Sequence, residues 1–272
     1  MKKILITGAN SYIGTSFEKY LNNNYFNDYE VDTADMIDGT WREKSFNGYD
    51  VVFHVAGIAH QKENKNNAHI YYEVNRDLAV ETAKKAKNDG VKQFIFLSSM
   101  SVYGMETGVI TKKTSPSPKT NYGKSKLQAE EHITSLRDES FKVCILRPPM
   151  VYGQGCKGNY NSIIRIVRKS FVFPRVNNRR SIIHINNLLS FTKKAIDESL
   201  DGLFFPQNRR YVSTIELAKD IANEMNKKIY MSYLLGFFII CMKPFSKTIR
   251  KAFGSLVYKD TDDFNFDYCG RS

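Results

Sequence analysis

Short apolar runs alternate with longer amphipathic stretches along the first half of the chain. The runs are typical of buried strands, and the stretches between them repeat apolar residues at helical spacing. Strands are predicted over 3–7, 29–32, 50–55, 93–97 and 142–146, and helices over 12–21, 70–87 and 122–136. Strands that alternate with helices indicate β–α–β units, so we predict an α/β fold built on a doubly wound parallel sheet.

The pattern changes after residue 147, where glycines mark several loops. Helices are predicted over 162–170 and 186–198, and a capping-box sequence at 213–216 opens another that runs to about 225. A further strand is expected near 204–205. We predict a small C-terminal substrate domain that is partly interleaved with the first domain. Residues 1–147 and about 181–205 would form the first domain, and about 148–180 and 206–272 the second.

Composition narrows the class of protein only a little. The 272 residues are 42% hydrophobic and 25% charged, which is ordinary for a globular protein and excludes a disordered chain or a coiled coil. The net charge of +12 comes from 40 Lys and Arg against 28 Asp and Glu that are spread along the chain. This favours a basic solvated surface, so no nucleic-acid partner is predicted. The four cysteines are far apart and no group has metal-ligand spacing, which predicts a reducing compartment and no metal site.

Two segments bear on where the protein resides. At the N-terminus, two lysines precede only three apolar residues, too few for the apolar region of a signal peptide. The apolar run 233–242 has about half of the roughly 20 residues that a membrane span needs. Because basic residues follow it, the run could lie on an anionic membrane, but a core helix of the small domain is the favoured interpretation. We therefore predict a cytoplasmic protein without stable membrane insertion.

A glycine-containing loop, TGANSYIG at 7–14, follows the first predicted strand. Gly8 permits a tight turn, Gly14 lets the next helix pack closely on the strand, and the N–H groups at the helix start would face an anion such as pyrophosphate. Asp32 lies at the predicted end of the second strand. A carboxylate there accepts hydrogen bonds from the adenosine ribose and repels a 2′-phosphate. The loop thus predicts a Rossmann-type dinucleotide-binding domain that takes NAD rather than NADP.

Candidate catalytic residues follow two later elements. Tyr122 and Lys126 are four residues apart, on one face of a predicted helix. Because a phenol has a pKa near 10, a nearby ammonium is needed to favour the phenolate. Ser99 follows a predicted strand and can offer its hydroxyl to the same reacting oxygen. The three side chains together predict acid/base chemistry at a hydroxyl or ketone.

These segments together resemble the extended short-chain dehydrogenase/reductase family, in particular its nucleotide-sugar epimerase/dehydratase branch. The resemblance spans nearly the whole chain. It rests on TGANSYIG (7–14), HVAG (54–57), Asn75, SSMSVYG (98–104), YGKSK (122–126), RPPMVYG (147–153) and RSIIHI (180–185).

The resemblance implies a role for each matching residue. Tyr122 would be the general acid/base, Ser99 would bind the reacting oxygen of the substrate, and Lys126 would hold the nicotinamide ribose. Asn159 and Arg180 would bind the diphosphate of a nucleotide-sugar substrate, which is expected to be UDP-linked. Ser11 replaces the middle glycine of the family's loop, so a slightly different loop path is expected. The residues expected to bind the cofactor are Gly8, Asn10, Ser11, Tyr12, Ile13, Gly14, Asp32, Ala56, Gly57, Asn75, Tyr122, Lys126 and Pro149.

The branch includes several reactions. Its 4,6-dehydratases carry an Asp-Glu pair where this chain has Met100 and Ser101, which cannot act as a general acid and base, so 4,6-dehydration is excluded. The resemblance then implies a UDP-hexose 4-epimerase with NAD as a transient hydride acceptor, in surface-polysaccharide precursor synthesis. Two alternatives stay open: an NAD(P)H-dependent 4-keto reductase that makes a UDP-6-deoxy-N-acetylhexosamine, and, more remotely, a non-catalytic dinucleotide sensor. The resemblance also implies a homodimer that pairs two helices per subunit, the Tyr122 helix among them.

Overall fold

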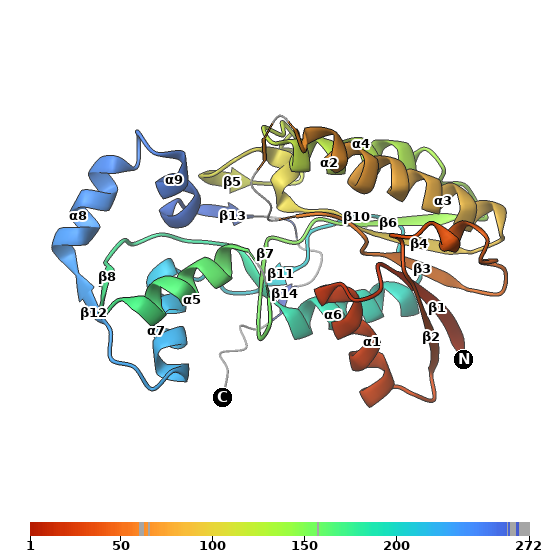
Figure 1. Ribbon diagram of the computed structural model, residues 1–272, viewed down its shortest axis with the longest axis horizontal. Helices are drawn as coiled ribbons and strands as arrows, with labels where there is room; N and C mark the ends of the chain where they lie inside the picture. The colour runs from red at the N-terminus through yellow and green to blue at the C-terminus, as the bar shows by residue number, and fades with distance from the viewer. Residues whose placement is uncertain (60–62, 65, 157, 260, 262–264, 267–272) are drawn as a thin grey trace.

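Six parallel strands form the central sheet of the protein in a computed structural model (Figure 1). The structure describes residues 1–59, 63–64, 66–156, 158–259, 261 and 265–266. The strand order is β10-β6-β4-β3-β1-β2, so the chain reverses its winding direction between β1 and β3. The six strands are β1 (Lys2–Thr7), β2 (Tyr29–Ala34), β3 (Val51–His54), β4 (Gln93–Leu97), β6 (Lys142–Leu146) and β10 (Gly202–Phe204).

Helices cover both faces of this sheet because alternate strand residues are apolar on both sides. Ile4 and Ile6 pack on one side with Phe17 of the first helix, whereas Leu5 between them faces the other side. Helices α1 and α6 lie on the first face, and α2, α3 and α4 on the second (Figure 1). Their bounds are α1 (Tyr12–Asn24), α2 (Ala68–Tyr72), α3 (Leu78–Asn88), α4 (Asn121–Thr134) and α6 (Ile185–Asp197). The predicted doubly wound α/β fold is confirmed.

Three short helical turns occur among the described elements around the sheet. A π-helical turn, Glu73–Asp77, joins α2 to α3 within the region predicted as one helix. A 3₁₀ turn, Met100–Tyr103, follows β4 directly, and a second, Thr40–Arg42, follows β2. The π-helical turn contains Asn75, and Ser99 is the N-cap of the turn after β4.

The remaining elements pack around two smaller cores at the other end of the molecule (Figure 1). The described residues form four two-stranded parallel pairs there: β5 with β13, β7 with β9, β8 with β12 and β11 with β14. Their bounds are β5 (Gly108–Ile110), β7 (Met150–Tyr152), β8 (Val172–Pro174), β9 (Ile182–His184), β11 (Gln207–Asn208), β12 (Tyr230–Ser232), β13 (Leu256–Tyr258) and β14 (Asn265–Phe266); the helices are α5 (Asn159–Lys169), α7 (Thr214–Glu224), α8 (Tyr233–Met242) and α9 (Lys247–Phe253). Between β9 and the later elements the chain returns to the central sheet through α6 and β10. The exact division into two domains stays a prediction.

Helix α8 differs from the sequence interpretation. A core helix was favoured for the apolar run 233–242, but most of its side chains are exposed, and Gly236 is its only buried residue. The favoured interpretation is therefore wrong. No helix in the described part of the chain is both long enough and apolar enough to cross a bilayer.

Candidate active site

The loop after β1 has the geometry of an anion-binding turn. Gly8 has a φ of 99°, which favours glycine. Ser11 is the N-cap of α1, and its Oγ accepts a hydrogen bond from the Gly14 N–H at 3.1 Å. The serine in place of the family's middle glycine thus caps the helix whose N-terminus faces the loop. Asn10 also has a positive φ, 65°, at the tip of the turn.

The loops after β1 and β3 touch each other where the winding direction reverses. A Cβ atom on Gly8 would lie 2.8 Å from the Ala56 backbone, so no larger residue fits there. Tyr12 and Ile13 begin α1 and pack on the adjacent core, and Tyr12 also reaches the Gly155 loop of the small domain. This crevice at the reversal point is where doubly wound sheets bind dinucleotides. The close backbone approach and the capped helix start fit the pyrophosphate of NAD.

The carboxylate at the end of β2 belongs to Asp35. Asp32 was placed at the strand end, but β2 continues to Ala34, and Asp32 pairs with Leu5 within the strand. The predicted strand end is therefore wrong by two residues, and Asp32 lies about 7 Å before the end of β2. Its binding of the adenosine ribose stays a prediction. Its carboxylate accepts a hydrogen bond from the Tyr49 hydroxyl at 2.5 Å. Asp35 follows the strand directly.

Asn75 fixes the loop after β3 from behind. Its Oδ1 accepts a hydrogen bond from the Ile58 N–H at 2.9 Å, and its Nδ2 donates to the Ile58 carbonyl at 3.1 Å. The side chain is fully buried in the π-helical turn, and a Cβ on Gly57 would come within 2.8 Å of Oδ1. The sequence predicts that Asn75 binds cofactor. In the structure its amide holds the Ala56–Gly57 loop, which makes it a positioning residue.

The three predicted catalytic residues come together beside that loop. Ser99 caps the 3₁₀ turn after β4, and Tyr122 lies in the first turn of α4, whose N-cap is Thr120. Burial raises the pKa of the Tyr122 phenol, and a hydrogen bond with the Ser99 hydroxyl acts in the opposite direction. A hydroxyl and a phenol that share one small volume can bind the same substrate oxygen.

Lys126 lies one helical turn after Tyr122 and is buried. Its Nζ donates to the Leu97 carbonyl at 2.9 Å and lies 4.5 Å from the centre of the Phe96 ring. Burial lowers the pKa of this ammonium to about 8, against the opposing effect of the Glu130 carboxylate. A Cβ on Gly57 would be 3.4 Å from Nζ, so the ammonium lies at the junction of the cofactor loop and the catalytic helix.

Glu63 contacts the start of α4, the helix of Tyr122 and Lys126. The sequence analysis did not predict this contact. Its carboxylate accepts hydrogen bonds from the N–H groups of Asn121 at 3.0 Å and Tyr122 at 3.1 Å. These are two of the N–H groups that a helix start leaves without a partner in the helix. The Tyr71 ring packs edge-on against Tyr122 with 6.5 Å between centres. Both contacts hold the phenol in place from outside α4.

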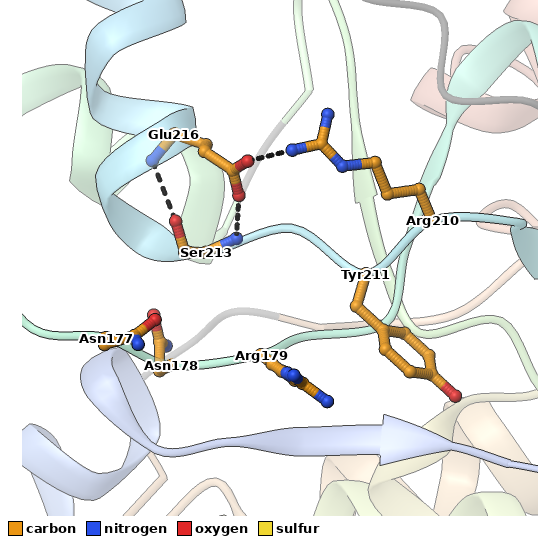
Figure 2. A pocket seen from close by; sticks show the side chains of 7 residues that line it. All are labelled: Asn177, Asn178, Arg179, Arg210, Tyr211, Ser213 and Glu216. Carbon is orange, nitrogen blue, oxygen red and sulfur yellow. Dashed lines mark hydrogen bonds and ion pairs between the residues drawn. The ribbon is translucent and has the colours of Figure 1, made fainter.

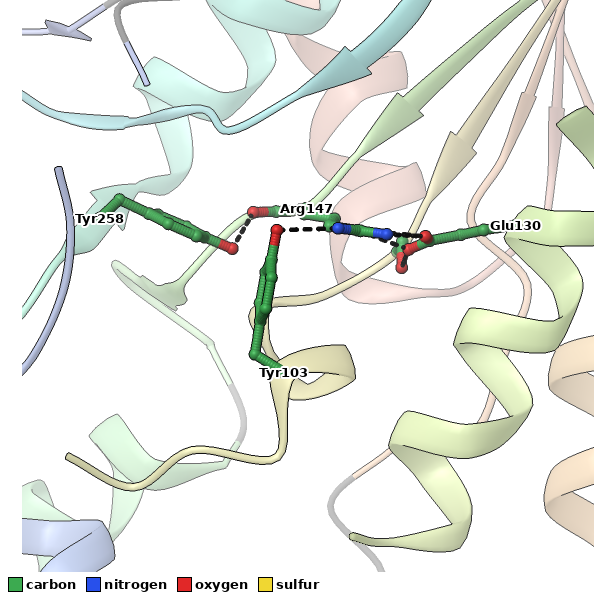
Figure 3. A network of polar contacts seen from close by, with 5 residues as sticks. Tyr103, Glu130, Arg147 and Tyr258 are labelled. Atoms are coloured by element: carbon green, nitrogen blue, oxygen red, sulfur yellow. Dashed lines mark hydrogen bonds and ion pairs between the residues drawn. The ribbon is translucent and has the colours of Figure 1, made fainter. Parts of the chain in front are cut away.

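A buried charged network lies behind the catalytic residues, and it too was not predicted (Figure 3). The Arg147 guanidinium, just after β6, pairs with the Glu130 carboxylate of α4, and both side chains are over 90% buried. Arg147 also donates to the Tyr103 hydroxyl at 2.8 Å, and its carbonyl accepts from the Tyr258 hydroxyl at 2.9 Å. The Ser98 hydroxyl donates to Glu130. The network therefore ties β4, β6, α4 and the small domain together directly behind Ser99.

The predicted substrate residues are less well placed. The Arg180 guanidinium donates to the carbonyls of Lys251 at 3.0 Å and Gly254 at 3.2 Å, at the C-terminal end of α9. These contacts give Arg180 a structural role, and binding of a diphosphate stays a prediction. Asn159 begins α5, but its side chain lies outside the described part of the structure. Pro149 is buried between β6 and β7.

A cavity of about 430 Å³ opens elsewhere, in the small domain (Figure 2). On one side of it, Arg210 pairs with Glu216, which also completes the capping box of α7 with Ser213. None of its lining residues is a predicted site residue. They are Asn177, Asn178, Arg179, Arg210, Tyr211, Ser213 and Glu216. In the described residues, no cluster of His, Cys, Asp and Glu could hold a metal ion.

Comparison with known proteins agrees with this geometry. The model of the NAD dependent epimerase/dehydratase family matches residues 4–202. The chain is 33% identical to a UDP-glucose 4-epimerase of Vibrio cholerae, over 92% of this chain and 83% of that protein. It is 25% identical to an N-acetyl-alpha-D-glucosaminyl-diphospho-ditrans,octacis-undecaprenol 4-epimerase of Escherichia coli O157:H7, over 86% and 76%.

Solved structures share the fold at lower identity. A UDP-glucuronic acid 4-epimerase from Bacillus cereus in complex with NAD superposes with a TM-score of 0.74 at 17% identity, over 96% of this chain and 90% of that one. A dTDP-4-dehydrorhamnose reductase from Clostridium acetobutylicum gives 0.70 at 23% identity, over 85% and 82%. At these identities the likeness concerns the fold, which epimerases and reductases share.

Proposed function

The chain belongs to the NAD dependent epimerase/dehydratase family, and on that premise we propose that it is a nucleotide-sugar 4-epimerase acting on a UDP-hexose. The observation that carries the proposal is the meeting of Ser99, Tyr122 and Lys126 beside the cofactor loop. The relation to the Vibrio cholerae UDP-glucose 4-epimerase supports the choice of sugar carbon and nucleotide.

The residues around the reversal point would hold NAD. The loop from Gly8 to Gly14 would take the pyrophosphate, Asp35 the adenosine ribose, and Ala56–Gly57 would lie beneath the dinucleotide. When bound, NAD supplies the transient acceptor for a hydride from the sugar carbon.

Side chains of the protein carry out the proton transfer. Tyr122 takes the proton of the C4 hydroxyl and returns it when the hydroxyl forms again on the other face. The Lys126 ammonium, protonated below about pH 8, lowers the cost of the phenolate. Ser99 donates a hydrogen bond to the same oxygen and so fixes its distance to the phenol.

The cofactor content of the purified protein tests this proposal against the reductase alternative. An epimerase regenerates its oxidised cofactor in each cycle, so NAD near one per chain is expected when the protein is denatured and the released nucleotide is separated by chromatography. Protein that is empty but binds NADH or NADPH reversibly, and that reduces a 4-keto sugar nucleotide, would overturn the epimerase assignment. Tyr122→Phe is the matched control, because it should keep the cofactor and lose turnover with either substrate.

A second substrate class is favoured by one specific observation, the exposed apolar helix α8. The Escherichia coli relative is named for a sugar linked through diphosphate to undecaprenol, a lipid. A sugar diphosphate is common to this substrate and to a UDP-sugar, so the same site could take either. Turnover of UDP-N-acetylglucosamine should be compared with that of the polyprenyl-linked sugar in detergent micelles. Activity confined to the lipid-linked sugar would replace the UDP-hexose assignment.

A further inference from the structure

Helix α8 is apolar on almost every side and yet lies at the surface. Seven of its ten residues are large, apolar and exposed, with Tyr233 at 70%, Phe237 at 61% and Phe238 at 56%. A helix that is apolar all round is normally buried. The seven residues are Tyr233, Leu234, Leu235, Phe237, Phe238, Ile240 and Met242.

The inner side of α8 rests on the small domain, so the helix is held in a fixed place. A Cβ on Gly236 would lie 2.1 Å from the Arg175 carbonyl, and Ile239 packs on the small-domain core. Beside the helix, Val172 of β8, Phe171 just before it and Tyr230 of β12 are exposed as well. Together with the seven residues of α8 and with Phe245, these three form what we call the α8 face. It lies at the end of the molecule opposite β1 and β2 (Figure 1).

Positive charge surrounds the α8 face. Residues 225–259 contain seven Lys and Arg and no Asp or Glu. The Arg175 guanidinium lies 4.3 Å from the centre of the Tyr233 ring, and the Lys227 ammonium 4.4 Å from that of Phe171. Glu106, from the neighbouring loop, pairs with Arg250 at 2.9 Å and lies 3.9 Å from Lys247. Charge and apolar surface thus occur side by side.

The dimensions limit what the face can bind. Ten helical residues span about 15 Å, half of the roughly 30 Å of a bilayer's hydrocarbon core. The helix can therefore lie in a membrane surface but cannot span it. We call the basic residues around the α8 face its rim. In a two-fold contact with a second copy of the chain, the two positively charged rims would face each other, and their repulsion is unfavourable. An anionic membrane surface provides acyl chains for the apolar side chains and negatively charged headgroups for the basic residues.

From these observations we propose that the α8 face docks the protein on anionic membranes. Phe237, Phe238 and their apolar neighbours enter the interface, while the lysines of the rim contact lipid phosphates. The proposal does not depend on the reaction that the site performs, and it is tested without substrate.

Vesicle co-sedimentation of the full chain tests the proposal. The protein should pellet with vesicles of phosphatidylglycerol and phosphatidylcholine, and less with phosphatidylcholine alone or at high salt. The double variant Phe237→Ser/Phe238→Ser should lower the partition coefficient at least about tenfold, because two buried aromatic rings are lost. Phe26→Ser/Ile37→Ser removes two exposed apolar side chains that flank β2 in sequence, and this variant should bind as the unaltered protein does. Thermal melting checks that each variant folds.

Charge variants separate the contribution of the rim. Lys247→Gln/Lys251→Gln should weaken binding to the anionic vesicles and flatten its salt dependence, whereas Lys84→Gln/Lys142→Gln should change neither. Absence of pelleting, or equal pelleting of Phe237→Ser/Phe238→Ser, would overturn the proposal. The proposal would also be overturned if the unaltered protein does not bind vesicles but forms a dimer in sedimentation velocity, and Phe237→Ser/Phe238→Ser abolishes that dimer. The α8 face would then be an interface between two copies.

Discussion

Replacing Glu130 by glutamine should destabilise the protein strongly, because it leaves the Arg147 charge buried without its partner. Both side chains are less than 10% exposed, and the carboxylate accepts from the Arg147 Nε at 3.0 and 3.1 Å, and also from Ser98. Removing one partner of such a pair costs about 3–5 kcal/mol. With a urea dependence of about 3 kcal/mol/M, the unfolding midpoint should fall by about 1 M or more.

Two further variants make the reasoning refutable. Glu81→Gln breaks the pair with Arg42, whose side chains are about half exposed, and should cost below about 1 kcal/mol. Glu130→Gln combined with Arg147→Met removes the uncompensated charge and should recover more than half of the loss. Urea unfolding followed by far-ultraviolet circular dichroism gives the three midpoints. If Glu130→Gln lowers the unfolding midpoint no more than Glu81→Gln does, the unpaired Arg147 charge costs no more than a surface charge, and the reasoning is refuted.

Three other expectations follow from the site. Tyr122→Phe removes the proton-carrying hydroxyl and should lower kcat by about 10²–10⁴-fold with NAD content unchanged; a fully active variant would contradict the assignment. Asp35→Asn should raise the dissociation constant of NAD about tenfold and reduce the preference for NAD over NADP, whereas Asp32→Asn should change the dissociation constant of NAD by less than about twofold. Fluorescence titration of both variants with NAD and NADP distinguishes the two carboxylates. Lys126→Met should raise the free energy of unfolding of the cofactor-free protein by about 1–3 kcal/mol at neutral pH, because burial lowers the Lys126 pKa from 10.5 to about 8 and each pKa unit is worth about 1.4 kcal/mol. This gain in stability should be full below pH 8 and should vanish as the pH rises toward 10.5, where Lys126 of the unfolded chain also loses its proton. Urea titrations at the two ends of this pH range measure the gain, and a gain independent of pH would refute burial of the ammonium as its cause.

Local sequence rules predicted the core of the fold and several of the residues that the structure brings together at the candidate site. The loop from Gly8 to Gly14 was found because a strand, a tight turn and a helix start lie within a few residues of one another. Tyr122 and Lys126 were found because helical spacing alone puts them on one face. Such features need no knowledge of distant contacts, so they can be predicted from a sequence.

Strand ends and long-range contacts could not be predicted in this way. Thr33 and the small Ala34 give only a weak apolar signal, so the end of β2 was placed two residues early and Asp32 was taken for its last residue. Glu63 reaches the start of α4 from a loop 58 residues earlier than Asn121, and no local pattern marks it. Helix α8 has the pattern of a core helix, and only its place at the end of the small domain reveals that it is exposed.

The buried charges behind the site can now be understood together. Lys126 and Glu130 are one turn apart on the same face of α4, where an ammonium and a carboxylate would ordinarily pair. Arg147 instead takes both carboxylate oxygens of Glu130, and Lys126 donates to the Leu97 carbonyl. Burial lowers the pKa of this ammonium, and the Glu130 carboxylate offsets the effect only in part. In the proposed mechanism, an arginine that binds the competing acid would preserve the positive charge that favours the Tyr122 phenolate. The loss of stability expected from Lys126 would then be the consequence of keeping that charge in place.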